Sequence, residues 1–446
     1  MFPQENHSNG YQHQQGYSHR ERVRRGTCRS RASTSSHSHS VRVYDQPRPP
    51  CTDFDVAYFH SYAHLGIHQE MIKDRVRTDT YRDAIMQHQS FIAGKVVVDV
   101  GCGTGILSIF CAQAGAKRVY AIDASDIALQ ANEVVKANNL SDVVVVLHGR
   151  VEDVEINEEV DVIISEWMGY MLLYESMLGS VINARDRWLK PGGLILPSSS
   201  TLYMAPVTHT DRYSDSVDFW RNVYGIDMSA MVSLAKQCAF EEPSVETITG
   251  ENVLTWPHVL VFSIISEKNV HSLLQVKYID SYSVTIQELE SVTAKFKFNS
   301  MMRGILLLSF LPFHWCIEPQ AVIIMFASPL HGFAFWFDVE FNGHAIPSTN
   351  YHSTTSFVDN HQMNGSQRKR RTNPNEALVL STAPEDPPTH WQQTLIYFYD
   401  PIELEQDQLI EGLVTLSQSK ENARFMNIHL EYTSGGRSYV KESVMR

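Results

Sequence analysis

The chain lacks the sequence features of several common protein classes. Its six cysteines include no C-x-x-C pair, which argues against a zinc site and a disulfide framework, so no metal is expected. A reducing intracellular compartment is then the default. The N-terminus has no apolar run suited to a secretory signal. Lys and Arg number 37 against 50 Asp and Glu, and the net charge of −13 argues against broad binding to nucleic acid backbones and favours cationic partners.

Aliphatic side chains are almost absent from residues 1–52, which are rich in His, Ser, Gln, Arg and Pro. Such a segment cannot bury enough apolar surface to offset the entropy lost on ordering. We therefore expect a disordered tail over 1–52. The whole chain of 446 residues is 43% hydrophobic, so the remainder suits two domains with sizeable cores.

The first half of the ordered chain has the pattern of an α/β domain. Apolar residues recur at helical spacing between Tyr58 and Gln87, which predicts N-terminal helices over 53–88. From 89 to 197, short apolar strands alternate with helical stretches, which is typical of a parallel sheet covered by helices on both faces. We predict a Rossmann-like domain over 89–197. Its expected strands are Val96–Val100, Arg118–Asp123, Val143–Leu147 and Val160–Ser165.

Residues 198–446 have a different pattern, in which strand-like runs such as His331–Phe341 and Thr394–Tyr399 replace most helices. This change predicts an antiparallel sandwich or barrel. A polar interruption at 348–375 is expected to be a disordered loop.

Two stretches of this second half, 261–275 and 304–328, do not fit the strand pattern and are expected to be insertions. The second is long and apolar, and a membrane-spanning helix needs about 20 mostly apolar residues. However, Pro312 and Pro319 would break a helix there. No membrane segment is predicted.

The glycine-rich stretch D-V-G-C-G-T-G-I-L, from Asp99 to Leu107, ends the first strand and opens a helix. A nicotinamide-dependent dehydrogenase would instead need the fingerprint G-x-G-x-x-G around a pyrophosphate. Here the pattern is G-x-G-x-G, and the preceding Asp99 would repel a pyrophosphate but attract a cationic amino group. The ligand implied has an amino acid portion, a ribose and no pyrophosphate. S-adenosylmethionine fits, so the stretch predicts a class I methyltransferase.

Two further carboxylates follow strands of the predicted sheet. Asp123 ends the second strand, where it can accept hydrogen bonds from both ribose hydroxyls, and Glu152 follows the third strand, near the expected adenine. Either acid alone is more often a solvated surface group. Together, in this order, they support the S-adenosylmethionine site.

The stretch S-E-W-M-G-Y-M-L-L-Y-E-S-M, from Ser165 to Met177, follows the fourth strand. Glu166 is therefore expected at the carboxyl edge of the sheet, where ligands of such sheets bind. Gly169 permits a turn, and the residues from Met171 to Met177 are expected to start a helix. Such a fold-back would bring Glu175 opposite Glu166 among aromatic side chains; the alternative is two exposed loop acids.

Two carboxylates in an apolar pocket repel each other, and one takes up a proton unless a cation lies between them. A planar guanidinium meets this demand, because its N–H groups can bond a carboxylate on each side. The pair thus suggests arginine as the substrate. Clamping one edge of the guanidinium should localise its charge there and leave electron density on the other nitrogen, which attacks the sulfonium methyl.

With these motifs the chain resembles the type I protein arginine N-methyltransferases, over roughly Phe54–Arg446 outside the two insertion-like stretches. In that family a "double-E" clamp corresponds to Glu166 and Glu175. The family usually has glutamate at the ribose position, and Asp123 is one methylene shorter. The cofactor contacts implied by the resemblance are His68, Arg77, Asp99, Gly101, Gly103, Asp123, Val151 and Glu152.

The resemblance also implies residues that close and shape the site. Tyr58 and Tyr62, in a Y-F-x-x-Y segment, belong to a lid helix over the cofactor. Met71 and Met177 restrict which nitrogen receives the second methyl and favour asymmetric dimethylarginine.

A T-H-W stretch, Thr389–Trp391, is expected to lie against the active site, with His390 paired to Asp74. That dyad either accepts the released proton or fastens the lid to the barrel, and the sequence leaves both roles open. Trp391 is expected to line the substrate pocket.

The family forms head-to-tail homodimers, which assigns 211–231 to a dimerisation arm. Expected substrates are Arg/Gly-rich proteins and histone tails, with no direct nucleic acid or membrane partner. Location in the nucleus is favoured over the cytoplasm by R-K-R-R at Arg368–Arg371, for which a solvated basic loop is the alternative. The insertions suggest a second hypothesis, an inactive isoform that serves as a cofactor- or partner-binding scaffold.

Overall fold

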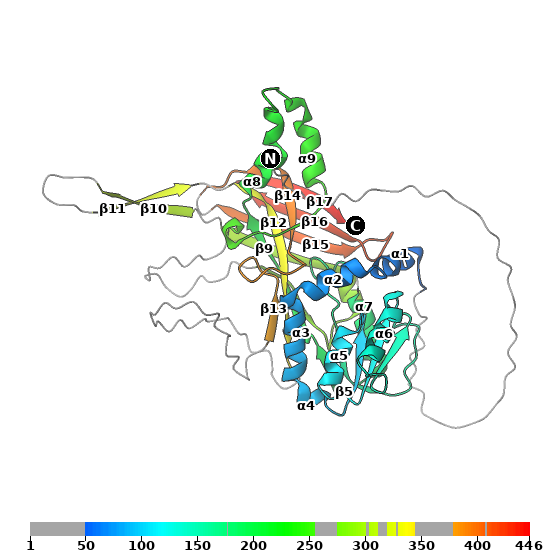
Figure 1. Cartoon of the computed structure of the whole chain (residues 1–446). Helices are drawn as coiled ribbons and strands as arrows, with labels where there is room; N and C mark the ends of the chain where they lie inside the picture. Colours follow the sequence, from blue (N-terminus) through cyan, green and yellow to red (C-terminus); the bar gives the residue numbers. More distant parts are fainter. Residues whose placement is uncertain are drawn as a thin grey trace, which may run out of the picture. The chain divides into compact units, whose positions relative to one another are not determined.

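The structure is a computed structural model, and it describes residues 50–175, 177–254, 274–299, 303–310, 319–326, 329–343, 378–405 and 408–446. Nearly all of the predicted tail over 1–52 and the whole predicted loop over 348–375 lie outside these residues, as does most of 261–275. From Arg48 to Arg446 the chain forms one compact unit (Figure 1).

Between residue 50 and the first sheet the structure has four helices: α1 (Asp53–Tyr62), α2 (Leu65–Lys73), α3 (Arg75–Gln87) and α4 (Gln89–Ile92). A capping box starts α1, in which the Thr52 side chain accepts from the Asp55 N–H and the Asp55 carboxylate accepts from the Thr52 N–H. Asp74 ends α2 and caps α3, because its carboxylate accepts the Arg77 N–H at 3.0 Å. The junction between α2 and α3 is therefore set by one aspartate.

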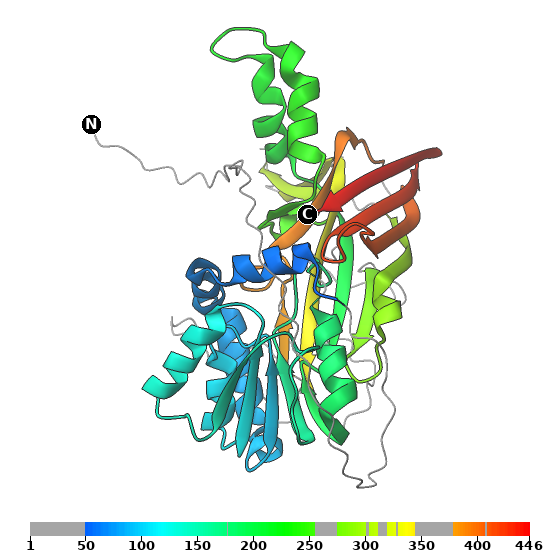
Figure 2. The same cartoon turned by 90° about the vertical axis from the view of Figure 1, so that its right-hand side faces the viewer.

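The next layer is a five-stranded parallel sheet in the order β3-β2-β1-β4-β5, with helices on its faces (Figure 2). The predicted doubly covered parallel sheet is confirmed. Chain order reverses beside β1, and open α/β sheets bind ligands at the carboxyl ends of the strands next to such a reversal. The bounds are β1 (Val96–Val100), α5 (Ile106–Gln113), β2 (Arg118–Asp123), α6 (Ile127–Ala137), β3 (Val144–His148), β4 (Val160–Ser165), α7 (Leu178–Trp188) and β5 (Leu189–Leu196).

In its described residues, the rest of the compact unit contains two large antiparallel sheets, as predicted for a barrel-like domain, and a separate two-stranded ribbon. One has the order β7-β14-β12-β6-β8, with β13 paired to β12, and the other has the order β17-β16-β15-β9. The strands are β6 (Ser199–Val207), β7 (Ser244–Glu246), β8 (Leu274–Asp280), β9 (Ser291–Asn299), β12 (Leu330–Phe341), β13 (Leu378–Ser381), β14 (Gln393–Ile402), β15 (Leu409–Gln418), β16 (Met426–Ser434) and β17 (Arg437–Met445). Short helices η3 (Gly250–Asn252) and α10 (Ile286–Glu290) lie between strands.

Aromatic side chains join the two antiparallel sheets. Phe333 of β12 packs edge-on against Phe296 of β9, with ring centroids 5.2 Å apart. Phe398 of β14 stacks on Tyr432 of β16 at 5.0 Å. Burying such large rings stabilises the contact between sheets and adds a geometric preference of about 0.5–1.5 kcal/mol per pair.

A helical segment stands out from the barrel-like half (Figures 1 and 2). It comprises α8 (Thr210–Ser216), η1 (Asp218–Arg221), η2 (Ser229–Met231) and α9 (Val232–Phe240). The stretch predicted as an arm, 211–231, lies within this longer segment. Several of its apolar side chains are exposed, above all Tyr224 at 99%.

The apolar stretch 304–328 contributes two strands instead of a helix. β10 (Arg303–Phe310) and β11 (Pro319–Phe326) pair with each other and, in the part of the chain that the structure describes, with no other strand. Figure 1 shows this ribbon projecting from the barrel-like half. Within the described ranges, no helix has the length and apolar character needed to cross a membrane.

Candidate active site

The glycine loop turns sharply between β1 and α5. Gly101, Gly103 and Gly105 have φ values of +73°, +54° and +84°, which favour glycine over residues with a side chain. A Cβ on Gly101 would lie 2.1 Å from Cε of Met177, so the Met177 side chain would have to move to admit it. The Gly103 N–H donates to the Asp123 carboxylate at 2.8 Å. The loop therefore exposes backbone without side chains at the edge of the sheet where a ligand is expected.

Asp99 lies beneath this loop and is fully buried. Its Oδ2 accepts the Ser108 hydroxyl at 2.6 Å, while no partner for its Oδ1 is found among the described residues. Burial raises the pKa of Asp99 to about 7, and the hydrogen bond from Ser108 lowers it only in part. An unpaired buried oxygen calls for a donor, and a cationic amino group would satisfy it. This orphaned oxygen fits the amino acid portion of S-adenosylmethionine.

The other predicted cofactor residues lie at the same edge of the sheet. Asp123 Oδ1 accepts both the N–H (2.8 Å) and the hydroxyl (2.6 Å) of Ser125, so this carboxylate is fixed at the end of β2. Glu152 accepts the Ser180 hydroxyl at 2.8 Å, and the neighbouring Val151 is buried. The structure brings these residues together; their contacts with a ligand stay predictions.

The lid helices reach both the glycine loop and the clamp. The hydroxyls of Tyr58 and Tyr62 donate to Oε2 of Glu175 at 2.8 and 2.7 Å. His68 is buried, its Nε2 contacts the Tyr62 carbonyl at 2.7 Å, and its ring lies so close to Gly103 that a Cβ there would come within 3.0 Å. α1 and α2 thus lie over the edge of the sheet.

Glu166 forms a buried ion pair with Arg77. Nε and Nη2 of the guanidinium lie 3.0 and 2.9 Å from Oε2 of Glu166, and both side chains are less than a tenth exposed. The resemblance assigned Arg77 to the cofactor carboxylate, but in this structure it meets one clamp carboxylate. Arg77 Nη1 also contacts the Met71 carbonyl, at 3.5 Å, which ties the predicted pocket residue Met71 to the same arginine.

Glu175 lies in a tight turn, not in a helix, so the predicted helix start at Met171–Met177 is wrong: α7 begins at Leu178. Met171, Leu172 and Glu175 all have positive φ, at 50°, 65° and 76°. A Cβ on Gly169 would lie 2.0 Å from the Tyr174 carbonyl, which shows how closely the turn folds back. Tertiary contacts override the helical sequence pattern here.

The pKa of Glu175 lies above that of an exposed glutamate. Burial raises its pKa most strongly; hydrogen bonds from Tyr62 and Tyr58 lower it, the charge of Glu166 raises it, and the net pKa lies above the usual value. The negative charge of Glu166 thus acts on Glu175, as expected for two carboxylates in one site.

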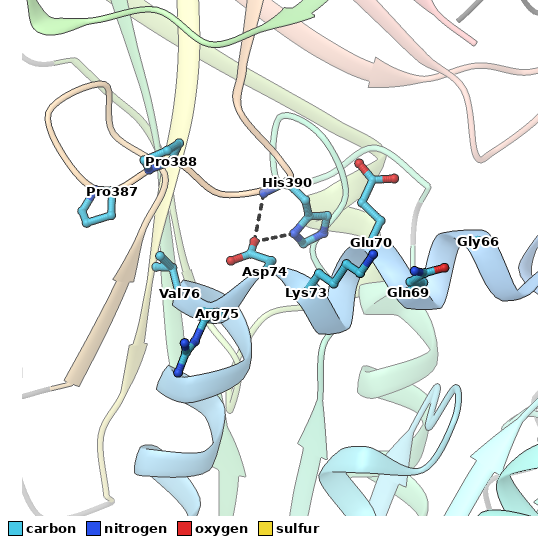
Figure 3. A pocket seen from close by; sticks show the side chains of 10 residues that line it. All are labelled: Gly66, Gln69, Glu70, Lys73, Asp74, Arg75, Val76, Pro387, Pro388 and His390. Atoms are coloured by element: carbon cyan, nitrogen blue, oxygen red, sulfur yellow. Dashed lines mark hydrogen bonds and ion pairs between the residues drawn. The ribbon is translucent and has the colours of Figure 1, made fainter. Parts of the chain in front are cut away.

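Asp74 and His390 tie the lid to the barrel-like half. Oδ2 of Asp74 contacts His390 Nδ1 at 2.7 Å and accepts the His390 N–H at 2.9 Å (Figure 3). Burial acts to raise the pKa of Asp74, but the hydrogen bonds from His390 and Arg77 outweigh it, so the pKa lies below the usual value. Trp391 is buried and donates to the Met168 carbonyl at 2.9 Å. The predicted contact between the lid helices and the barrel-like half, through Asp74 and His390, is thus present.

An open pocket of about 790 Å³ adjoins this dyad, between α2, the start of α3 and the loop at 387–390 (Figure 3). Its lining residues are Gly66, Gln69, Glu70, Lys73, Asp74, Arg75, Val76, Pro387, Pro388 and His390. Neither clamp glutamate, Glu166 or Glu175, is among its lining residues. Within the described residues, no group of His, Cys, Asp or Glu side chains is arranged to hold a metal.

Sequence reasoning missed one arginine at this site. Arg424, in the turn between β15 and β16, places its guanidinium carbon 3.8 Å from the centre of the Tyr58 ring and donates to the Glu175 carbonyl at 2.8 Å. A lone arginine between two strands gives no signal of such a role, because the contact depends on how the two halves pack.

Comparisons with known proteins agree with this geometry. The family model for the arginine methyltransferase oligomerization subdomain matches residues 198–364 and 369–437, and the model for ribosomal protein L11 methyltransferase matches 84–198. The "Probable protein arginine N-methyltransferase 6" of Arabidopsis thaliana is 69% identical over 411 residues, which cover 91% of this chain and 85% of that protein.

The chain belongs to the protein arginine N-methyltransferase family. Solved structures of other members superimpose on it. The Trypanosoma brucei PRMT1 enzyme-prozyme heterotetramer with AdoHcy has a TM-score of 0.65 at 30% identity, covering 86% of this chain and all of that one. Arabidopsis protein arginine methyltransferase 10 has a TM-score of 0.64 at 30% identity, covering 87% of this chain and all of that one.

Membership confirms the predicted activity at the level of the family. The protein is an arginine methyltransferase that uses S-adenosylmethionine, and the orphaned Oδ1 of Asp99 beneath the bare glycine loop fits that cofactor. The oligomerization subdomain indicates that this methyltransferase assembles into an oligomer.

Proposed function

We propose that this methyltransferase is a type I enzyme that converts protein arginine to monomethylarginine and then to asymmetric dimethylarginine. The observation that carries the proposal is that Glu166, Glu175 and the lid tyrosines form one buried cluster at the carboxyl edge of the sheet. The Arg77–Glu166 ion pair, in which a guanidinium lies against one of the two glutamates, supports the proposal. A substrate guanidinium clamped between the two glutamates would have its charge drawn to the clamped edge.

Each residue of the site has its own role in the proposed reaction. Glu166 and Glu175 hold and orient the guanidinium, and such orientation removes a large part of an activation barrier, of the order of 7–11 kcal/mol at best. When bound, S-adenosylmethionine supplies a methyl group activated by the sulfonium. Arg77, freed from Glu166, would meet the cofactor carboxylate. Asp74 fastens the lid through His390, and we infer that the same dyad takes up the released proton.

Type I specificity is inferred from Met71 and Met177, which the family resemblance assigns to the substrate pocket. Cε of Met177 lies against the glycine loop, and the Met71 carbonyl lies at Arg77. A pocket narrowed by two methionines would admit the second methyl only on the nitrogen that already carries the first. The test is mass-spectrometric fragmentation of a dimethylated Arg/Gly-rich peptide after incubation with enzyme and S-adenosylmethionine. Loss of dimethylamine supports the proposal, and loss of monomethylamine overturns it.

The proposed substrates are histone tails and Arg/Gly-rich proteins, and the proposed location is the nucleus. The net charge of −13 suits basic partners, and R-K-R-R at 368–371 supports nuclear import. Transfer of labelled methyl to histones and to an Arg/Gly-rich peptide tests the first point. A fluorescent fusion with these four residues changed to alanine tests the second, since unchanged nuclear accumulation would remove the support.

The proposed assembly is a homodimer joined by the arm. Tyr224, Ile226 and Phe219 expose more than half of their surface on it, as expected of an interface that is uncovered in a single chain. Replacing Tyr224 and Ile226 with serine should shift the sedimentation coefficient from dimer to monomer.

A second candidate function is a scaffold that binds cofactor or partners without turnover. The β10–β11 ribbon favours it, because these two strands pair with no other strand that the structure describes. Cofactor binding measured by calorimetry, without any transfer of label to peptide, would support the scaffold over the enzyme.

A further inference from the structure

Arg424 occupies a position between three elements that are far apart in sequence. It lies in the turn from Ser419 to Phe425, between β15 and β16, and the turn is braced by its own hydrogen bonds. One of these joins Oδ1 of Asn422 to the Arg424 N–H at 3.0 Å. The side chain is 18% exposed, so most of the guanidinium is packed against protein. The barrel-like half thus presents a fixed guanidinium to the lid and the clamp.

The guanidinium contacts helix α1 on two sides. Its Nε and Nη2 donate to Oδ1 of Asp55 at 3.0 and 2.8 Å, and its plane lies over the Tyr58 ring at 3.8 Å. Close by, Phe54 packs on Phe425, with ring centroids 6.1 Å apart. Because Asp55 also closes the capping box of α1, the arginine is attached to the first turn of the lid helix itself.

The same arginine takes up both backbone polar groups of Glu175. Its Nη1 donates to the Glu175 carbonyl at 2.8 Å, and its own carbonyl accepts the Glu175 N–H at 3.3 Å. Glu175 has a φ of +76°, a conformation that costs a residue with a side chain of the order of 1 kcal/mol or more. Two hydrogen bonds from one partner offset that cost and hold the turn.

We propose that Arg424 is a positioning residue for the substrate clamp, which fixes Glu175 directly and fastens the lid helix α1 over it. The backbone of Glu175 is set by Arg424, and its carboxylate is set by Tyr58, which Arg424 also holds. Arg424 donates its hydrogen bond to the backbone carbonyl of Glu175 and not to the carboxylate, so the carboxylate stays available for substrate. The inference rests on the proposed role of Glu175 in binding substrate.

The experiment compares Arg424→Met, Arg424→Lys and the control Arg118→Met in the full chain. Arg118 is an arginine in a surface ion pair with Glu158, distant from the clamp in sequence. Arg424→Met should lower kcat/KM for peptide by about 10-fold to 100-fold, the loss typical of a displaced reactive group. Hydrogen exchange of the amides over 53–62 should become faster. Arg118→Met should change neither.

The pH dependence separates charge from geometry. The positive charge of Arg424 lowers the pKa of Glu175, so its removal should move the acidic limb of the kcat/KM profile to higher pH. Arg424→Lys keeps the charge but loses the two-sided contact, so its acidic limb should stay in place while exchange over 53–62 still becomes faster. If Arg424→Met does not fold, the hydrogen exchange of residues 53–62 in Arg424→Lys tests the positioning role.

Activity within twofold of the unaltered enzyme, or unchanged exchange over 53–62, would overturn the proposal. Glu175→Gln, assayed in parallel, keeps this failure distinct from failure of the proposed function. If Glu175→Gln is inactive and Arg424→Met is fully active, only the positioning role is lost. If Glu175→Gln is itself fully active, the clamp assignment falls, and the positioning role falls with it.

Discussion

Glu166 and Glu175 are the same residue type in one site, yet the regions that hold them differ. Glu166 follows β4 directly and faces a cation, Arg77, at 2.9 Å. Glu175 lies in a left-handed turn and accepts only neutral hydroxyls on its carboxylate, from Tyr58 and Tyr62. Burial raises the pKa of Glu175 more than these two hydrogen bonds lower it. One half of the clamp belongs to the sheet, and the other depends on the lid and the barrel-like half.

The largest effect is expected from removing either charge of this pair. Glu166→Gln and Glu175→Gln should each lower turnover by about 10²-fold to 10³-fold, as loss of a group that stabilises the transition state does. Cofactor affinity, measured by calorimetry, should change little. An equal loss of turnover and cofactor affinity would contradict the clamp role and place the residue in the cofactor site.

The next effect concerns the protonation of Glu175. Its raised pKa means that the ionised clamp is lost at a higher pH than for an ordinary glutamate as the solution is acidified. Tyr62→Phe and Tyr58→Phe each remove a hydrogen bond that lowers this pKa. Each change should move the acidic limb of the kcat–pH profile upward by about one pH unit, since a hydrogen bond to a charged group contributes about 1.5–3 kcal/mol. An acidic limb that moves to lower pH, or does not move, would contradict the role of these two hydrogen bonds in lowering the pKa of Glu175.

A smaller effect is expected from untying the lid at Asp74. His390→Ala should lower the free energy of unfolding by about 1–3 kcal/mol, because the buried Asp74 carboxylate loses a partner. The folded pKa of Asp74 lies below its ordinary value of 3.8, so this contribution is complete above that value and is lost as the pH falls through the lower folded pKa. Denaturant titration at neutral pH and below pH 4 measures both parts. Equal losses at the two pH values would contradict the ion pair.

The smallest effect on the clamp is expected from deleting 304–328. The β10–β11 ribbon pairs with no other described strand, so its removal should leave turnover per folded molecule and cofactor affinity within about twofold. Solubility should increase, since an apolar ribbon with unpaired edges promotes association. Sedimentation and turnover of the deleted and full chains give the comparison. Unchanged solubility and oligomeric state would refute the expectation that the ribbon promotes association.

Much of the fold followed from pattern alone, and the exceptions are instructive. The strands of the parallel sheet were predicted nearly to the residue, since buried parallel strands read as continuous apolar runs. The residues from Met171 to Met177 were expected to start a helix, because their local propensity is helical. That expectation failed where three residues adopt positive φ and a distant turn binds the backbone.

Residues close together in the chain were enough to predict the glycine loop that follows Asp99, the order of acids at the strand ends and the presence of a glutamate pair. These depend on residues close together in the chain and on the rule that parallel strands end at one edge. Only the tertiary structure decided that Arg77 meets Glu166, and that Arg424 meets a residue 249 positions away. Such contacts arise when separately folded layers pack, and no local periodicity encodes which side chains will then face one another.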